Sequence, residues 1–165
     1  MDVLFHMILG MIISKQIFQN YSLVIIIASI LPDLIGTSCN EVLKITHSLK
    51  KSFKNFFTNY MKYTRQMSFF GKTDRFLYKF MHSFTSWLIF SSIIFIFFRN
   101  LFIIASLAYL LHIIIDISTH DKQFTLELFY PFSKFQIEGR SWRQDWGIFL
   151  TYWAILILVI LFLVF

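Results

Sequence analysis

The chain has 165 residues, of which 57% are hydrophobic and only 15% are charged, and its formal net charge is +6. Soluble domains carry about a quarter charged residues, and here the apolar residues also gather in blocks. The composition therefore excludes an ordinary soluble domain and indicates one integral membrane domain over residues 1–165. Because Cys39 is the only cysteine, an intramolecular disulfide and a cysteine-based zinc site are excluded as well.

Five apolar blocks predict an all-α fold, a bundle of about five hydrophobic membrane helices. In chain order the blocks cover residues 3–18, 21–36, 84–98, 101–117 and 147–165. The last block carries no charge and has the length that crosses a bilayer, about 20 residues. Arg99 and Asn100 separate the third and fourth blocks and predict a tight helical hairpin. These two blocks are short for a full span, so we expect them to extend further or to thin the bilayer locally.

A lysine-rich segment, residues 37–81, separates the second and third blocks. From Val42 to Tyr60 its apolar residues recur at steps of three and four, and lysines fill much of the remaining surface. This pattern predicts a basic amphipathic helix on an anionic membrane surface; a solvated helix packed on the protein is the alternative. Nothing in the segment resembles a base-reading module, so we expect no nucleic-acid partner.

The basic residues also predict the orientation in the membrane. Lys and Arg concentrate in residues 37–81 and 118–146, whereas the opposite side of the implied zigzag has only Lys15 and Arg99. Basic loops are enriched on the cytoplasmic side. We therefore expect a multi-pass protein of the cell membrane with both long segments and the N-terminus in the cytoplasm and the C-terminus outside.

Ionisable residues stand at the ends of four blocks, where a charge is costly unless it is paired or hydrated. With the N-terminus inside, all four ends lie at the cytoplasmic face. The residues at these ends are His6, Asp33, His82, His112 and Asp116, with His120 one turn later. Pro32 is predicted to break or kink the helix beside Asp33.

His112 and Asp116 are four residues apart, so a helix places both on one face, and His120 extends the row if the helix persists. Imidazole and carboxylate groups suit zinc, manganese or iron. Neighbouring ions of this kind favour hydrolysis, because they activate a water and clamp a phosphoryl oxygen. The alternatives are a structural intramembrane pair for His112 with Asp116, an interfacial carboxylate for Asp33 and a loop position for His120.

At these residues the chain resembles the family of membrane-bound metal-dependent hydrolases. The resemblance covers about residues 3–146 through short motifs. The matches are His6, Leu31-Pro32-Asp33, His82-Ser83, His112-x-x-x-Asp116 and Tyr130-Pro131, and Thr119 with His120 fits a variant of the fourth. The family often has His-Arg-Gly before its Thr-His-Ser motif, whereas residues 77–81 here are Leu-Tyr-Lys-Phe-Met, so one candidate ligand of the family is missing.

The ligand pattern of that family is remotely similar to zinc-dependent phospholipase C, which implies hydrolysis of a phosphoester; the membrane location suggests a lipid substrate. The resemblance thus implies a divalent metal cofactor, zinc first, and membrane lipids as partners. Asp33, His82, His112 and Asp116 are expected as core ligands and catalytic residues, and His6 and His120 as further ligands. Arg75 or Lys79 is expected to hold an anionic head group. A metal-binding or transport protein without hydrolytic activity, and a structural membrane protein without metal, are the alternatives.

Overall fold

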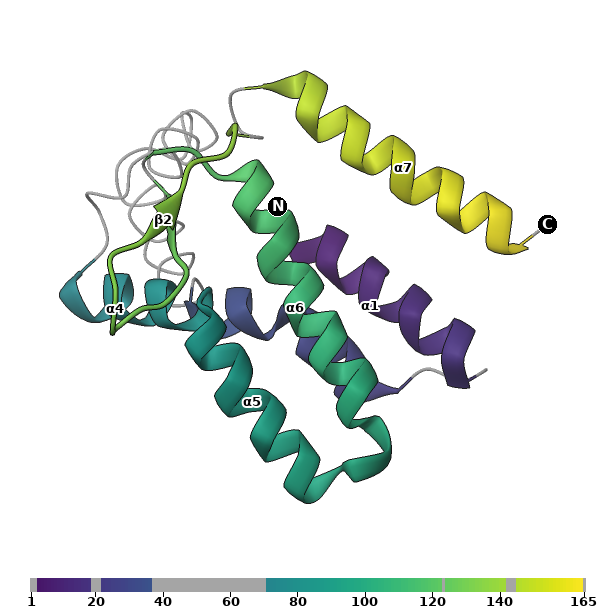
Figure 1. Cartoon of the computed structure of the whole chain (residues 1–165). Helices are drawn as coiled ribbons and strands as arrows, with labels where there is room; N and C mark the ends of the chain where they lie inside the picture. The colour runs from purple at the N-terminus through teal and green to yellow at the C-terminus, as the bar shows by residue number, and fades with distance from the viewer. Residues whose placement is uncertain (1–2, 19–21, 37–70, 123, 142–144, 165) are drawn as a thin grey trace, which may run out of the picture.

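The computed structural model describes residues 3–18, 22–36, 71–122, 124–141 and 145–164, and helices dominate it (Figure 1). Its elements are α1 (Val3–Phe18), the helix Leu23–Gly36, α4 (Lys72–Met81), α5 (Phe84–Phe97), the 3-10 turn η2 (Arg99–Leu101), α6 (Phe102–Thr119), β1 (Leu126–Glu127), β2 (Gln136–Ile137) and α7 (Trp146–Val164).

The all-α membrane architecture predicted from the sequence is confirmed. Arg99–Thr119 and Trp146–Leu163 are each long and apolar enough to cross a membrane. The fourth block thus extends at both ends beyond the predicted 101–117, and the longer helical segment has the length needed to cross a bilayer. The amphipathic helix predicted around residues 42–60 lies outside the described residues.

Of the break or kink expected at Pro32, the break is wrong, because the helix runs from Leu23 through Pro32 to Gly36 without interruption. A proline removes a single intrahelical hydrogen bond, and membrane helices tolerate it where neighbouring helices pack around the freed backbone. Pro32 is fully buried in the bundle, which fits this reason.

A break is found instead between α4 and α5, whose axes are bent by 65°. Ser83 caps α5 by accepting a hydrogen bond from the Ser86 amide at 3.2 Å. The Met81 carbonyl accepts from the Tyr109 hydroxyl at 2.7 Å and from the Ser86 hydroxyl at 3.0 Å. Because side chains satisfy the backbone at this break, His82 can sit between two helices with its ring inside the bundle.

The helices α5 and α6 form the predicted hairpin around η2. Small residues line their contact, with Ser91, Ala105 and Ser106 all buried. Trp87 donates from Nε1 to the Ser106 carbonyl at 2.9 Å, and the hydroxyls of Ser91 and Ser106 lie 2.7 Å apart. Close packing and interhelical hydrogen bonds of this kind hold helices together in lipid.

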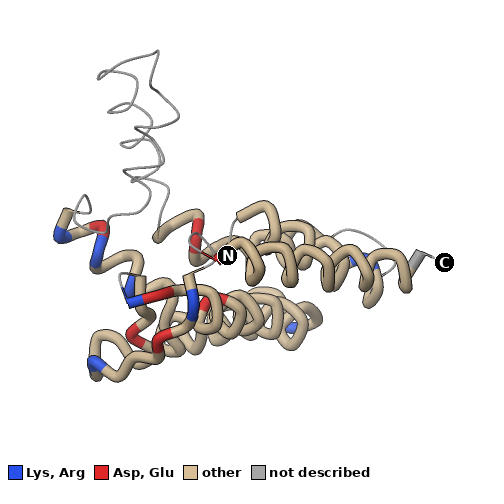
Figure 2. Tube along the Cα trace, turned by 90° about the horizontal axis from the view of Figure 1, so that it is seen from above, with Lys and Arg blue, Asp and Glu red and all other residues tan. Residues whose placement is uncertain are grey.

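After α6 the chain forms a short antiparallel hairpin that the sequence analysis did not predict. Leu126 pairs with Ile137 and Glu127 with Gln136. Leu126 and Leu128 are buried against Tyr78 and Tyr109, so the hairpin completes the apolar packing at that end of the bundle. Figure 1 shows it reaching back toward α4 before the chain continues to α7, which lies beside α1. In Figure 2 the charged positions, blue and red, gather at the end that carries α4 and the hairpin, whereas the opposite end has very few of them.

Candidate metal centre

Four buried side chains converge at the charged end of the bundle. Asp33 belongs to the helix Leu23–Gly36, His82 lies at the break before α5, and His112 and Asp116 lie on one face of α6. One nitrogen or oxygen atom from each of the four lies within 4.8 Å of the others. These four residues are called the His/Asp cluster below; the sequence analysis predicted all of them as core ligands.

The distances within the cluster suit a single small cation. Asp116 Oδ2 lies 3.2 Å from His112 Nε2 and 3.5 Å from His82 Nε2. Asp33 Oδ1 lies 3.5 Å from His82 Nε2 and 4.0 Å from His112 Nε2. Ligands about 2.0–2.1 Å from one tetrahedral zinc ion are separated by roughly 3.4 Å. Two imidazoles and two carboxylates at these separations therefore fit zinc, and the same donors suit manganese or iron.

Backbone carbonyls fix how the two imidazoles are oriented. His82 Nδ1 lies 2.9 Å from the Tyr78 carbonyl oxygen, and His112 Nδ1 lies 2.8 Å from that of Ser29. A carbonyl only accepts, so each Nδ1 carries the hydrogen and the Nε2 of a neutral ring presents its lone pair. Metal-binding histidines are commonly held in this way.

The lone pairs then face negatively charged oxygens. Both Nε2 atoms are buried, and neither makes a hydrogen bond within the described part of the chain. A lone pair directed at a carboxylate is repulsive unless a cation or a proton lies between them. A shared cation would relieve both contacts at once, so these four residues form a candidate metal site.

His6 and His120 flank the cluster at the other oxygen of Asp116. His6 Nε2 donates to Asp116 Oδ1 at 3.2 Å, and its ring contacts that of His112 at a centroid distance of 3.8 Å, with the two rings tilted by 30°. His120 follows the last residue of α6; its Nδ1 lies 2.9 Å from the Asp116 carbonyl and 3.7 Å from Asp116 Oδ1. Both residues predicted as outer ligands thus lie beside the cluster, near the same oxygen of Asp116.

The model of the YdjM inner membrane protein family matches residues 1–165. The chain belongs to the YdjM inner membrane protein family. Comparison with curated proteins and with solved structures gives no match. Family membership and the apolar helices place the protein in a membrane.

In this YdjM-family chain, α4 carries the two residues predicted to hold a head group. Lys79 forms an ion pair with Glu127 of β1, with Nζ 2.5 Å from Oε1, and Nζ lies 5.9 Å from the Tyr130 ring centroid. Arg75 is exposed on the same helix. The structure therefore gives Lys79 a role in attaching α4 to the hairpin, and substrate binding by Lys79 and Arg75 stays a prediction.

Two glycines that sequence reasoning passed over allow the helices to approach the cluster. A Cβ on Gly36 would lie 3.2 Å from His82 Cε1, and a Cβ on Gly10 would lie 2.8 Å from the Ser29 Cβ and even closer to its hydroxyl. Glycine is unfavourable inside a helix, so its presence in an apolar block is the signal that could have identified both positions. The Ser29 carbonyl left no such signal, because any residue supplies that group.

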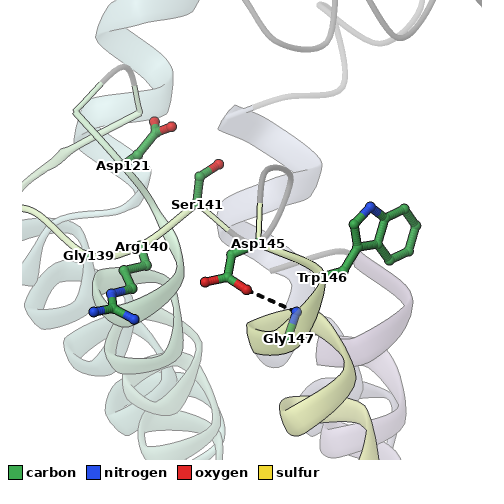
Figure 3. A pocket seen from close by; sticks show the side chains of 7 residues that line it. All are labelled: Asp121, Gly139, Arg140, Ser141, Asp145, Trp146 and Gly147. Carbon is green, nitrogen blue, oxygen red and sulfur yellow. Dashed lines mark hydrogen bonds between the residues drawn. The ribbon is translucent and has the colours of Figure 1, made fainter.

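A polar hollow of about 590 Å³ lies where α6 ends and α7 begins (Figure 3). Its lining residues are Asp121, Gly139, Arg140, Ser141, Asp145, Trp146 and Gly147. Asp145 caps α7 by accepting from the Gly147 amide at 2.9 Å, and the Gly139 amide donates to the His120 carbonyl at 2.8 Å. The hollow thus adjoins His120, the least enclosed of the candidate histidines.

Proposed function

We propose that this YdjM-family protein is a membrane-bound metal-dependent hydrolase of a phosphoester, with a phospholipid as its substrate class. The observation that carries the proposal is the orientation of His82 and His112, each anchored through Nδ1 and directed through Nε2 at Asp33 and Asp116. Zinc, or manganese or iron in its place, would be held by these four residues. A metal ion bound there would polarise a phosphoryl oxygen and activate a water.

Protein groups around the cluster hold the four candidate ligands in place. His6 donates to one oxygen of Asp116, so the other oxygen stays directed at the two Nε2 atoms. The Tyr78 carbonyl fixes the orientation of the His82 imidazole, and the Ser29 carbonyl fixes that of His112. Ligands fixed by surrounding hydrogen bonds lose little freedom on binding a metal. His120, next to the polar hollow, is suitably placed to pass a proton between solvent and the cluster.

The substrate and orientation parts of the proposal rest on location and charge. The cluster lies toward the end of apolar helices, which is where we expect lipid head groups to meet the protein. Arg75 and Lys79 on α4 supply positive charge at the same end, which favours an anionic head group. The excess of Lys and Arg at this end leads us to propose that it faces the cytoplasm, with the C-terminus outside.

A second candidate function, metal binding or transport without hydrolysis, is favoured by the burial of the cluster. His82, His112 and Asp116 are fully buried. Such enclosure suits an ion that passes or stays at the site, whereas an ester must also reach it. Ionisable residues inside membrane proteins commonly mark ion pathways.

Turnover separates the two candidates. Protein purified in mild detergent, stripped with a chelator and reloaded with zinc, manganese or iron is given phosphodiesters and phospholipid vesicles. The hydrolase proposal expects release of product only with metal. Metal uptake into sealed vesicles without product would favour transport, and protein that binds none of the three metals would contradict both candidates.

A further inference from the structure

The turn between β1 and β2, residues 129–135 and called the aromatic turn below, exposes large aromatic side chains. Phe132 at its tip is 84% exposed, and the half-exposed rings of Phe129 and Phe135 lie 6.1 Å apart. Phe76 on α4 extends this surface, with its ring 5.6 Å from that of Tyr130. Contiguous apolar surface of this kind marks an interaction site.

The aromatic turn is attached to the first residue of a membrane helix. The Phe84 amide, at the start of α5, donates to the Leu128 carbonyl at 2.7 Å, and the rings of Phe84 and Phe129 lie 5.7 Å apart. One turn further along α5, Leu88 and Ile89 are exposed in the way that lipid-facing residues are. The apolar surface of α5 and that of the aromatic turn therefore adjoin each other.

The charges around the aromatic turn suit a lipid surface. Three basic side chains are exposed here: Lys134 within the turn, and Lys72 and Arg75 on α4. One acidic residue, Asp74, lies between the two on α4. Glu127, at the base of the hairpin, is paired with Lys79. Exposed aromatic rings beside basic side chains are typical of segments that lie at the boundary between head groups and acyl chains, where anionic lipids attract the basic residues.

We propose that the aromatic turn inserts into the lipid leaflet at the end of the bundle that carries the His/Asp cluster. The segment after α6 then has a membrane-embedded tip and is not a solvated loop. Through Leu126 and Leu128 the embedded hairpin packs on Tyr78, whose ring lies 4.5 Å from that of His82. The proposal is independent of the hydrolase proposal and holds whether or not the cluster hydrolyses an ester.

Depth-dependent quenching in vesicles tests the insertion. Cys39→Ser removes the native thiol, and Phe132→Cys in that full-length background carries an environment-sensitive fluorophore. The labelled protein is reconstituted in phosphatidylcholine vesicles containing phosphatidylglycerol. Phe162→Cys on α7 is the lipid reference, because Phe162 is also 84% exposed, and Lys122→Cys in the exposed turn after α6 is the aqueous reference.

We expect lipids with a quencher high in the acyl chain to dim the label at 132 as they dim the label at 162, while iodide dims only the label at 122. Adding Phe129→Ser and Phe135→Ser should shift the label at 132 from lipid quenching toward iodide quenching. Iodide access at 132 equal to that at 122 would overturn the proposal. Shielding from both quenchers that disappears when the protein is diluted into excess lipid would also overturn it, because a second copy would then be the occupant.

Discussion

His112 on α6 donates a hydrogen bond of 2.8 Å from Nδ1 to the carbonyl oxygen of Ser29, a residue 83 positions earlier in the chain. This contact joins two helices and at the same time sets which nitrogen of His112 faces Asp33 and Asp116. The orientation of the imidazole is therefore a product of helix packing, and metal binding should respond to changes at both ends of the contact.

Replacing His112 with alanine should remove bound metal while the protein still inserts into the membrane. The change deletes one of four ligands and makes α6 more apolar. Metal per protein, measured by elemental analysis after gentle purification, should fall to the level of a blank. Ile114→Leu is the matched control, since Ile114 is exposed on the same helix. A His112→Ala protein with its full metal complement would refute the metal centre. His120→Ala, at the edge of the cluster, should lower metal content less.

Metal removal should lower thermal stability. A ligand that binds only the folded protein stabilises it by about 2.7 kcal/mol at a concentration a hundredfold above its Kd. Chelator treatment should therefore lower the Tm of the detergent-solubilised protein, and added zinc should restore it. Asp33→Asn, which weakens a ligand without changing its shape, should show a smaller response to zinc. Equal zinc-dependent shifts in both proteins would exclude Asp33 as a ligand.

Gly10→Ala should destabilise the protein by about 1–3 kcal/mol, the usual cost of inserting a methyl group into a packed interior. The new Cβ would lie 2.8 Å from the Ser29 Cβ, so α1 and the helix Leu23–Gly36 must separate. Unfolding in detergent, followed by circular dichroism, measures the loss. Ser29→Gly keeps the carbonyl and removes the obstructing side chain, so the double variant should regain part of the stability. No recovery would mean that Gly10 is needed for another reason.

The ion pair between Lys79 and Glu127 allows a structural role of Lys79 to be distinguished from a role in substrate binding. Lys79→Glu places two acidic side chains together and should lower the Tm, whereas Lys79→Glu with Glu127→Lys restores opposite charges and most of the Tm. If Lys79 also holds an anionic head group, the exchanged pair should still show a raised KM for a phosphoester. A normal KM in the exchanged pair would assign Lys79 to the hairpin contact alone.

The proposed topology can be checked in cells with single cysteines in a Cys39→Ser background. Lys122→Cys should be protected from a membrane-impermeant thiol reagent in intact cells, and Arg99→Cys should react. The physical reason is the enrichment of basic residues on the cytoplasmic side. Labelling of Lys122→Cys together with protection of Arg99→Cys would place the cluster on the outer face.

Sequence reasoning located the helices and the cluster because both depend on local patterns. The apolar blocks are long compared with their interruptions, and His112 and Asp116 show their relation through helical spacing alone. Asp33 and His82 could be assigned to the same site as His112 and Asp116 only because the positions of the basic loops predicted which helix ends lie together. The distribution of Lys and Arg along the sequence predicts the topology of a membrane protein, and the topology predicts which helix ends are neighbours.

The remaining features depend on contacts that no local pattern encodes. Pro32 was expected to interrupt a helix, but packing around it overrides that preference. The true break at His82 depends on Tyr109, which supplies a hydroxyl to Met81 from another helix. The strands of two residues each are too short for a periodic signal. Their pairing follows from the burial of Leu126 and Leu128.

The His/Asp cluster draws its residues from three separate stretches of chain, and the flanking His6 is 110 positions from Asp116, which it contacts. Membrane helices insert individually before they associate. No single inserted helix holds more than two of the four cluster residues, so the full ligand set exists only after association. An ion bound by all four would therefore stabilise the assembled bundle selectively, and its dissociation would accompany separation of the helices.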